Sequence, residues 1–273
     1  MASYLGAVHP VGDSLAVFRI WIAGGVALVG LIALLASAKR AGWLAIVFAA
    51  VAGGPIAAMV YAPSGEAPAG AVTIYTKNTL GGWGDDAAIT ADILDSGADI
   101  VLLQELSQTR SDFGGALQDT HPHQHVCRFS DWSGMAVFSR WPVLETYCSP
   151  HRSFAAAQVD APGGPVWAVS THLVWPYPHA QARYLEEALP FLESVEGRVI
   201  VAGDFNMVPW GYSVRQIEEA TGTGRIGPLF TTIEVRDVPL QIDHVLTNGT
   251  GMVERRPRLG SDHYGLVAQI GWE

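Results

Sequence analysis

Charged residues are scarce in this sequence: they make up 15% of its 273 residues, and the mean hydropathy is positive at +0.23. A typical soluble domain carries about a quarter charged residues. The shortage argues against a chain that is soluble along its whole length and indicates a membrane portion. The length allows one large domain or two small ones.

Lysine is nearly missing from the larger part of the chain, where Lys77 is the only one after residue 64. Residues 1–64 hold three of the 16 basic residues and one of the 26 acidic ones, a net charge of +2. The remainder therefore holds 13 basic and 25 acidic residues, a net charge of −12. Such an acidic portion has no evident field for gripping a long polyanion, unless a few arginines or bound metal ions reverse the local sign.

Several motifs of catalytic and metal-binding proteins are also missing. The sequence has no cluster of cysteines and histidines spaced for structural zinc, and it has no His-Glu-x-x-His. It has no Gly-x-Ser-x-Gly, which argues against acyl hydrolysis by a serine nucleophile. We find no glycine-rich phosphate loop of the nucleotide-binding kind, no repeat and no low-complexity tract.

Cysteine occurs twice, at Cys127 and Cys148, about one predicted hairpin apart. In an oxidising compartment the two could form a disulfide, worth about 3 kcal/mol for a loop of this size in the chain-entropy model. Two buried free thiols are the alternative. The sequence leaves both open.

Two long uncharged runs stand at the N-terminal end. Ile20–Ala38 has 19 residues and Ala41–Ala62 has 22, with Gly53-Gly54-Pro55 as a kink in the second. Lys39 and Arg40 separate them. A membrane-spanning helix needs roughly 20 apolar residues, so both runs are long enough.

A cleaved signal peptide is the alternative for the first run, because Ala36-Ser37-Ala38 resembles a cleavage site. The run is too long for that, no lysine precedes it, and the second run would remain. We predict a transmembrane hairpin over residues 1–62, with helices at about 20–38 and 42–62. The positive-inside rule places its turn in the cytoplasm, so the rest of the chain would lie outside a bacterial inner membrane.

Residues 63–71 are small, polar and rich in proline, which is typical of a linker. From Val72 onward, strand and helix patterns follow one another to residue 273. We predict strands near 72–77, 100–103, 123–128, 134–139, 143–148, 154–159, 166–171, 198–206, 240–247, 251–256 and 264–270, and helices near 85–96, 108–119, 179–195 and 211–220. This mixture predicts an α/β (α+β) fold with two sheets packed face to face and helices outside.

Polar residues recur directly after apolar strands. In Arg198–Asn206, Asp204 and Asn206 follow Val-Ile-Val-Ala-Gly and lie on one side of an extended backbone. Any one such residue is more often a solvated turn, but the recurrence indicates a site, because rigid scaffolds carry sites on the loops that follow their strands. The full set is Asn78, Glu105, His172, Asp204, Asn206, Asp243, Asp262 and His263.

Metal-assisted hydrolysis of a phosphate ester suits this set. Its carboxylates would hold a hard, oxygen-preferring cation such as Mg²⁺ or Mn²⁺. A histidine needs a carboxylate to fix its tautomer, and a phosphate in transfer needs donors and positive charge around its oxygens.

These residues stand in motifs that resemble, in order, those of the endonuclease/exonuclease/phosphatase superfamily. The motifs are Asn78, Gln104-Glu105, Thr171-His172-Leu173, Gly203-Asp204-Phe205-Asn206, Ile242-Asp243-His244-Val245-Leu246 and Ser261-Asp262-His263. The superfamily includes deoxyribonuclease I-like nucleases, abasic-site endonucleases, inositol polyphosphate 5-phosphatases and neutral sphingomyelinases. The resemblance covers about residues 72–273 and implies a four-layer α/β/β/α sandwich with divalent-metal phosphoesterase activity.

The resemblance also implies roles for the individual residues. Glu105 would be the principal metal ligand, with Asn78 and Asp262 close to the metal or the phosphate. Asp204 would orient or deprotonate the attacking water. The remaining roles are hydrogen bonding to the phosphate by Asn206, orientation of His263 by Asp243, and proton transfer or charge stabilisation by His263 and His172. Which histidine is the acid and which the base stays open.

The substrate is set by loops outside the motifs. A linker of about 8 residues reaches at most ~28 Å, so it would keep the enzyme near its membrane. We therefore expect a phosphate ester or pyrophosphate of a lipid or lipid carrier. A surface-anchored nuclease acting on DNA or RNA is the alternative, and intact motifs argue against an inactive binding protein. No protein partner is implied.

Other residues near the motifs bear on the substrate without deciding it. Loop aromatic residues could seat a lipid head group or stack on a base, or they could only pack. They are Trp132, Trp141, Trp175, Tyr177, Trp210 and Tyr212. Arg255, Arg256 and Arg258 could bind a second phosphate or form an exposed strand face.

Overall fold

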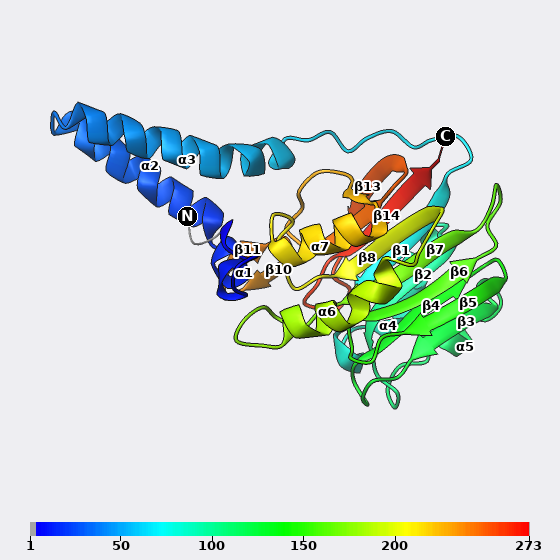
Figure 1. Ribbon diagram of the computed structural model, residues 1–273. Helices are drawn as coiled ribbons and strands as arrows, with labels where there is room; N and C mark the ends of the chain where they lie inside the picture. Colours follow the sequence, from blue (N-terminus) through cyan, green and yellow to red (C-terminus); the bar gives the residue numbers. More distant parts are fainter. Residues whose placement is uncertain (1–3, 273) are drawn as a thin grey trace.

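Two six-stranded sheets pack face to face in the computed structural model, which describes residues 4–272 (Figure 1). The first sheet has the order β13 (Thr250–Arg256), β14 (Gly265–Gly271), β1 (Val72–Asn78), β2 (Ile100–Leu106), β4 (Gly134–Ser139) and β3 (His123–Cys127). The second has the order β5 (Val143–Cys148), β6 (Phe154–Val159), β7 (Val166–His172), β8 (Arg198–Asp204), β12 (Asp243–Thr247) and β9 (Gly224–Arg225). A separate small hairpin consists of β10 (Ile233–Val235) and β11 (Val238–Leu240).

Helices cover the outer face of each sheet. The first sheet is covered by α4 (Asp86–Asp95) and α5 (Phe113–Leu117), and the second by α6 (Gln181–Leu192) and α7 (Tyr212–Thr221). Three apolar layers result, one between the sheets and one under each pair of helices. The four-layer α/β/β/α sandwich expected from the sequence is thereby confirmed.

The central strands are apolar on both faces because both faces are buried. In β8, Ile200 points between the sheets while Val201 points under α6 and α7. In β2, Leu102 and Leu103 divide in the same way between the two layers of the first sheet. Such strands show continuous apolar runs instead of alternation, which is why the runs in the sequence predict them.

Two pairs of parallel strands fix where their polar ends meet. β1 pairs with β2 so that Asn78 lies beside Gln104, and β7 pairs with β8 so that His172 lies beside Asp204. The helices α4 and α6 make the two crossovers. Both pairs therefore end at one edge of the sandwich.

The helix expected at 108–119 is shorter in the structure, where α5 covers only Phe113–Leu117. Asp112 caps it by accepting a hydrogen bond from the Gly115 backbone N–H, at 2.9 Å. An N-cap residue has a non-helical backbone, so the helix cannot extend toward residue 108. The strand expected at 240–247 is likewise interrupted, between β11 and β12.

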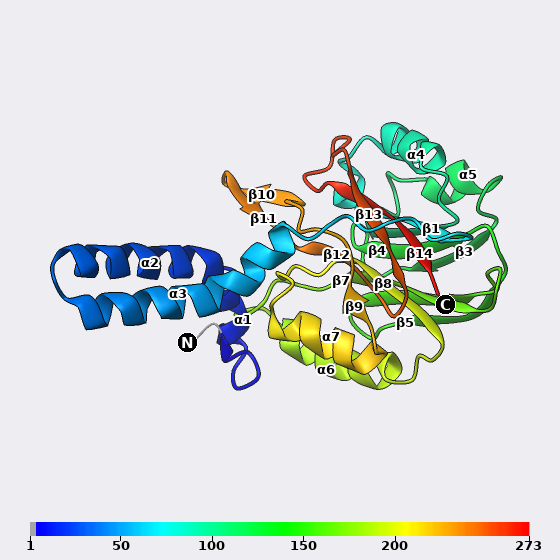
Figure 2. The ribbon, with the colours of Figure 1, turned by 90° about the horizontal axis from the view of Figure 1, so that it is seen from above.

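Three helices precede the sandwich: α1 (Val11–Ala16), α2 (Arg19–Leu35) and α3 (Lys39–Val60). α2 and α3 lie side by side and extend away from the sandwich (Figures 1 and 2). Over the described residues, α3 is the one helix long and apolar enough to cross a membrane.

The first predicted membrane helix, at about 20–38, is shorter in the structure. α2 has 17 residues and ends at Leu35, and Ser37 takes a positive φ of 64° in the turn before α3. A two-helix transmembrane arrangement over residues 1–62 therefore stays a prediction. Residues 62–71 contain no helix or strand.

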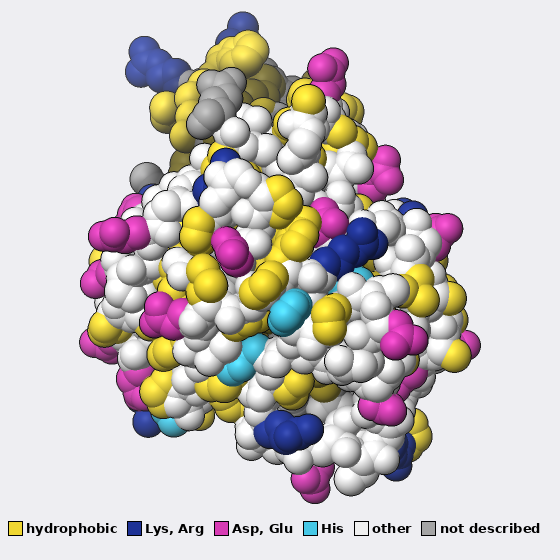
Figure 3. Space-filling view, turned by 90° about the vertical axis from the view of Figure 1, so that its right-hand side faces the viewer, with side chains coloured by type: hydrophobic (Ala, Val, Ile, Leu, Met, Phe, Trp, Pro, Cys, Tyr) yellow, Lys and Arg dark blue, Asp and Glu magenta, His cyan; other side chains and the backbone are white. Residues whose placement is uncertain are grey.

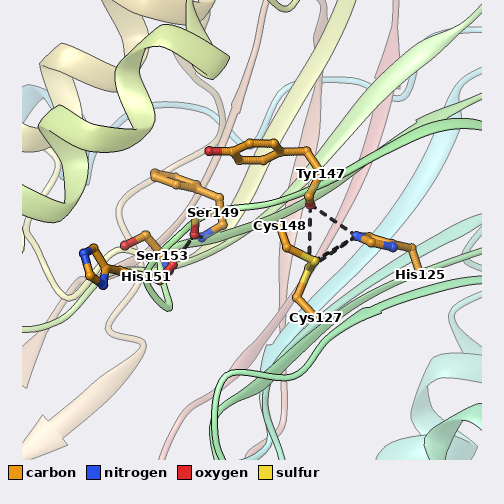
Figure 4. The surroundings of a disulfide bond; sticks show 8 residues. His125, Cys127, Tyr147, Cys148, Ser149, His151 and Ser153 are labelled. Atoms are coloured by element: carbon orange, nitrogen blue, oxygen red, sulfur yellow. Dashed lines mark hydrogen bonds between the residues drawn. A yellow bond between two sulfur atoms is a disulfide. The ribbon is translucent and has the colours of Figure 1, made fainter.

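The two cysteines form a disulfide between Cys127 and Cys148 (Figure 4). Cys127 ends β3 and Cys148 ends β5, which are edge strands of different sheets. The expectation that one hairpin separates them is wrong, because the chain changes sheets after β4. The bond therefore joins the two sheets at one side of the sandwich, where His125 Nε2 also lies 3.2 Å from the Tyr147 carbonyl oxygen.

Gly203 precedes Asp204 in β8, and its backbone conformation and surroundings leave no room for a side chain. Its φ is 141°, and a Cβ there would meet the backbone oxygen of Thr171 on the paired strand β7. Gly197 also has a positive φ, 82°, but a Cβ there would have nothing within 4 Å. A side chain at Gly203 would thus meet both backbone strain and a steric collision, whereas one at Gly197 would meet strain alone.

We expect Gly203→Ala to lower the free energy of unfolding by about 3 kcal/mol or more, because strain and collision add. Gly197→Ala should cost only about 1 kcal/mol from strain alone. Melting temperatures of the detergent-solubilised full chain measure the difference. Equal melting temperatures for the two variants would contradict this account of Gly203.

Candidate functional site

Strand ends from both sheets bring the candidate residues together. Asn78 ends β1, Glu105 lies near the end of β2, and His172 and Asp204 end β7 and β8. Asp243 begins β12 and lies opposite Asp204 in the antiparallel pair β8–β12. Asn206 follows β8, and His263 precedes β14, at the same edge.

Asp204 is the centre of this group. Its side chain is 1% exposed. Its Oδ1 accepts a hydrogen bond from the Asn206 backbone N–H at 2.8 Å, and its Oδ2 accepts from Asn78 Nδ2 at 3.1 Å and Asn206 Nδ2 at 3.2 Å. The Nε2 atoms of His172 and His263 each lie 3.7 Å from Oδ2. Burial raises the pKa of Asp204 to about 6, against the opposing effect of His263.

His263 and Asp243 form a buried pair. Asp243 Oδ2 lies 2.9 Å from His263 Nδ1, so the carboxylate accepts from the Nδ1–H group, orients the ring and leaves Nε2 facing Asp204. Burial works to lower the pKa of His263, but the charges of Asp243 and Asp204 outweigh it and raise that pKa to about 10. The ring therefore carries a positive charge in this arrangement.

His172 stands on the other side of Asp204, next to Glu105. Its Nε2 lies 3.3 Å from Glu105 Oε1. Its buried Nδ1 has no hydrogen-bond partner among the described residues. Burial works to raise the pKa of Glu105, but hydrogen bonding and charge from His172 outweigh it and the pKa falls below its usual value. Glu105 is thus a carboxylate, and its side chain is 20% exposed.

Two site residues have a left-handed backbone, which few non-glycine residues adopt. Glu105 has a φ of 53° and Asn206 a φ of 45°. Each such residue costs on the order of 1–3 kcal/mol unless its surroundings hold it. Asn206 is held by its own amide, which donates to the Leu173 carbonyl oxygen at 2.8 Å as well as to Asp204. Both amide hydrogens are then used within the protein.

Lys77 is a supporting residue that we did not predict from the sequence. It is 1% exposed, and its Nζ donates to the backbone oxygens of His263, at 2.9 Å, and Pro257, at 3.2 Å. Burial lowers the pKa of Lys77 to about 8. The sequence did contain a signal for this role: Lys77 is the only lysine after residue 64, and it stands next to Asn78 in a predicted strand.

Other supporting side chains are uncharged and buried. Gln104 Nε2 donates to Ser170 Oγ at 2.9 Å, which ties β2 of the first sheet to β7 of the second. Ser261 Oγ donates to the Asn78 backbone oxygen at 2.8 Å and accepts from the His263 N–H at 3.1 Å. These hydrogen bonds hold the motif residues in place, and the side chains that make them do not line the cavity described below.

Asp262 differs from the other predicted residues because its side chain is exposed. Its charge contributes to the raised pKa of His263, so it lies near the group, but no hydrogen bond or ion pair joins it to the others among the described residues. The metal role expected of Asp262 stays a prediction.

The three arginines before the Ser-Asp-His motif contact protein groups. Arg256 forms ion pairs with Asp92 and Asp95. Arg258 pairs with Glu234, and Arg255 lies over the Tyr264 ring. Contacts with protein groups argue against a phosphate site. The alternative, an exposed strand face, fits Arg255 alone, because Arg256 and Arg258 are partly buried and Arg258 lies beyond β13.

A cavity of about 390 Å³ opens beside the group. Glu105, His172 and Asn206 form one wall. The other residues that line it include Trp132, Arg152, Trp175, His179 and Tyr184. Arg152 lies over the Trp132 ring, with its Cζ 4.6 Å from the ring centroid. Of the loop aromatics singled out in the sequence, Trp132 and Trp175 line this cavity.

Two sets of groups offer metal ligands. The Asp204, Asp243 and His263 ligand atoms lie within 4.8 Å of one another, but they already hydrogen-bond to protein groups. Glu105 instead presents a partly exposed carboxylate at the cavity wall, near Asn78. Its oxygen donors fit a hard cation such as Mg²⁺.

Comparison with known proteins agrees with this arrangement. The model of the endonuclease/exonuclease/phosphatase family matches residues 75–263. The search of curated proteins gave no match.

Solved structures share the fold at low sequence identity. The 3′ phosphatase NExo from Neisseria, bound to a product DNA hairpin, is 18% identical with a TM-score of 0.58, covering 74% of this chain and 100% of its own. Sphingomyelinase C from Streptomyces griseocarneus is 16% identical with a TM-score of 0.55, covering 74% and 99%. An AP endonuclease from Archaeoglobus fulgidus is 15% identical with a TM-score of 0.58, covering 72% and 98%.

Such identities establish the common fold, while the family model spans the strand ends from β1 to His263 that build the site. Enzymes of this family hydrolyse phosphoesters with the help of divalent metals. On these grounds the chain belongs to the endonuclease/exonuclease/phosphatase family.

Proposed function

We propose that the protein is a membrane-anchored, divalent-metal-dependent phosphoesterase that hydrolyses a phosphate ester or pyrophosphate of a lipid or lipid carrier. The observation that supports the reaction is the position of Asp204 between two histidines, each with a carboxylate partner of its own. That arrangement gives a base, a positive charge and a proton donor in one buried group beside the cavity that Glu105, His172 and Asn206 line.

Glu105 would hold the metal ion, with Asn78 close by and Asp262 as a further candidate. A bound Mg²⁺ or Mn²⁺ would supply positive charge to the phosphate oxygens. Because Glu105 faces the cavity as a carboxylate and its pKa is lowered, it is ready to bind a cation at neutral pH.

Asp204 would orient or deprotonate the attacking water. A raised pKa of about 6 makes it a better base than an ordinary aspartate while it stays ionised at neutral pH. His263, kept charged by Asp243, would stabilise the negative charge that builds on the phosphate. His172 would donate to the phosphate or the leaving group. Asn206 would hold Asp204 in place, since both of its amide hydrogens are already used.

A lipid substrate is supported by the apolar helices α2 and α3 and by the net charge of −12 after residue 64, which repels a polyanion. The alternative, a nuclease, is supported by structural neighbours that act on DNA. A panel of duplex and single-stranded DNA, RNA, inositol lipids, sphingomyelin and polyprenyl pyrophosphate would decide between them. Hydrolysis that weakens steeply with added salt would favour the nuclease.

We expect His263→Ala and Asp204→Asn each to lower turnover of bis(p-nitrophenyl) phosphate by about 10²–10⁴-fold, because each removes a group that acts on the reacting atoms. Circular dichroism should show an unchanged fold. His123→Ala, on the edge strand β3, is the matched control and should retain activity. Near-normal turnover in either site variant would refute the assignment.

Glu105→Gln should raise the Mg²⁺ concentration for half-maximal activity by about tenfold or more, because an amide binds the cation more weakly than a carboxylate. Glu145→Gln, on the exposed edge strand β5, should leave the titration unchanged. A metal titration of Glu105→Gln that matches the unmodified protein would exclude Glu105 as the principal ligand.

The disulfide supports a location outside the cytoplasm, since such bonds persist in oxidising compartments. We therefore expect alkaline phosphatase fused to the C-terminus to be active in a bacterial host and a cytoplasm-dependent fluorescent reporter to be dark. Thiol titration of the unreduced, unfolded protein should find no free thiol. The opposite reporter pattern would place the sandwich in the cytoplasm.

A further inference from the structure

Aromatic side chains mark both ends of the helical pair. Trp21, near the start of α2, is 58% exposed, and Tyr61, after the end of α3, is 86% exposed. Both stand at the end next to the sandwich. Trp43, at the far end of α3, is 59% exposed and follows Lys39 and Arg40 closely. Tryptophan and tyrosine gather at the two surfaces of a bilayer, so Trp21 and Tyr61 would mark the surface nearer the sandwich.

The segment before α2, residues 5–17, is docked on the sandwich. The Asp13 carboxylate, 7% exposed, accepts hydrogen bonds from the backbone N–H groups of Tyr212, at 2.6 Å, and Ser213, at 3.0 Å. These are in the first turn of α7, whose own N-cap, Gly211, offers no side chain. Trp210 Nε1 donates to the Ala16 carbonyl oxygen at 2.7 Å. Asp13 thus caps a helix almost two hundred residues away in sequence.

The same segment contacts the loop at the rim of the cavity. Ser14 Oγ donates to the Tyr177 carbonyl oxygen at 2.6 Å, and the His9 and Tyr177 rings meet edge-on with centroids 5.6 Å apart. Tyr177 belongs to the loop 173–180, which follows His172 and contributes Trp175 and His179 to the cavity. A continuous path of contacts therefore joins the cavity to the base of α2.

The base of α3 contacts a second loop region. The Leu229 N–H donates to the Met59 carbonyl oxygen at 3.2 Å, and Pro239 and Leu240 line a small apolar cavity with Trp21, Ile56 and Val60. The hairpin β10–β11 thus stands beside the helices (Figure 2). Its turn exposes Val235 and Val238, each 38% exposed.

These parts share one side of the molecule. Figures 1 and 2 show α2, α3 and the β10–β11 hairpin on one side of the sandwich, and the C-terminus on the other. β14 ends at the C-terminus, and β1 is antiparallel to it, so the carboxyl ends of β1 and its parallel neighbour β2 face the side of the helices. Figure 3 faces the right-hand side of Figure 1, away from α2 and α3, and there acidic and basic side chains are interspersed among apolar ones.

We propose that the segment 5–17 is a bracket that holds the rim of the cavity against the surface of the bilayer crossed by α2 and α3. The loop 173–180 and the β10–β11 turn lie at that surface, and the substrate is a phosphate-bearing lipid of the same leaflet. This proposal rests on the proposed membrane anchoring and phosphoesterase function. A linker alone would leave the domain free to turn, whereas the bracket fixes which face meets the lipid.

Spin labels on introduced cysteines test this orientation in the full chain, reconstituted in vesicles of phosphatidylcholine and phosphatidylglycerol. The native disulfide is kept by labelling without reductant. At Tyr177→Cys and Val235→Cys the label should be more accessible to oxygen than to a nickel chelate, as at a bilayer surface. At Leu144→Cys, on the edge strand β5, nickel should prevail. Labels that are equally accessible to nickel at all three positions would overturn the proposal.

The bracket itself is tested by repeating the Tyr177→Cys measurement with Asp13→Ala and Asp13→Asn. Alanine removes the cap of α7, so the label should move to the aqueous pattern, while asparagine keeps an acceptor oxygen and should preserve the membrane pattern. Turnover of bis(p-nitrophenyl) phosphate should be unchanged in both. A membrane pattern that persists in Asp13→Ala would refute the bracket. Failure of the unmodified protein to hydrolyse bis(p-nitrophenyl) phosphate would refute the proposed function separately.

Discussion

The Asp204 carboxylate is the group on which the rest of the structure depends. It is almost completely buried, and a buried charge is tolerated only where hydrogen bonds and opposite charges replace its water. Those partners come from both sheets: Asn78 ends a strand of the first, and His172 ends a strand of the second. The two sheets must therefore pack in one relative position for Asp204 to receive its hydrogen bonds. The same relative position assembles the site.

The supporting groups show what that arrangement demands. Lys77 is buried with two backbone carbonyl oxygens as hydrogen-bond acceptors, and one of them belongs to His263. Gln104 and Ser170 link the sheets directly below the strand ends. The left-handed backbone at Glu105 is retained among these contacts. Buried hydrogen-bonded groups thus fix the strand ends relative to one another, in addition to the apolar layers that pack the sheets.

The sequence was sufficient for most strands and for the candidate residues that gather around Asp204, because central strands buried on both faces give unbroken apolar runs and polar residues end them abruptly. It did not identify Lys77. It was insufficient where a contact joins distant segments. The cysteine pair crosses from one sheet to the other, and Asp13 caps a helix that begins at Tyr212. No local pattern marks either contact. The length of α5 was misjudged for a local reason, the Asp112 cap, that the pattern did contain.

The placement of the arginines bears on the proposed choice of substrate. Arg256 and Arg258 are paired with acidic side chains, and Arg110 lies over the Trp83 ring. Among the described residues that line the cavity, Arg152 is the only arginine or lysine. A long nucleic acid is bound through a row of cations that neutralise successive phosphates. A single cation beside two tryptophans is instead consistent with the proposed substrate, one phosphorylated head group attached to an apolar body.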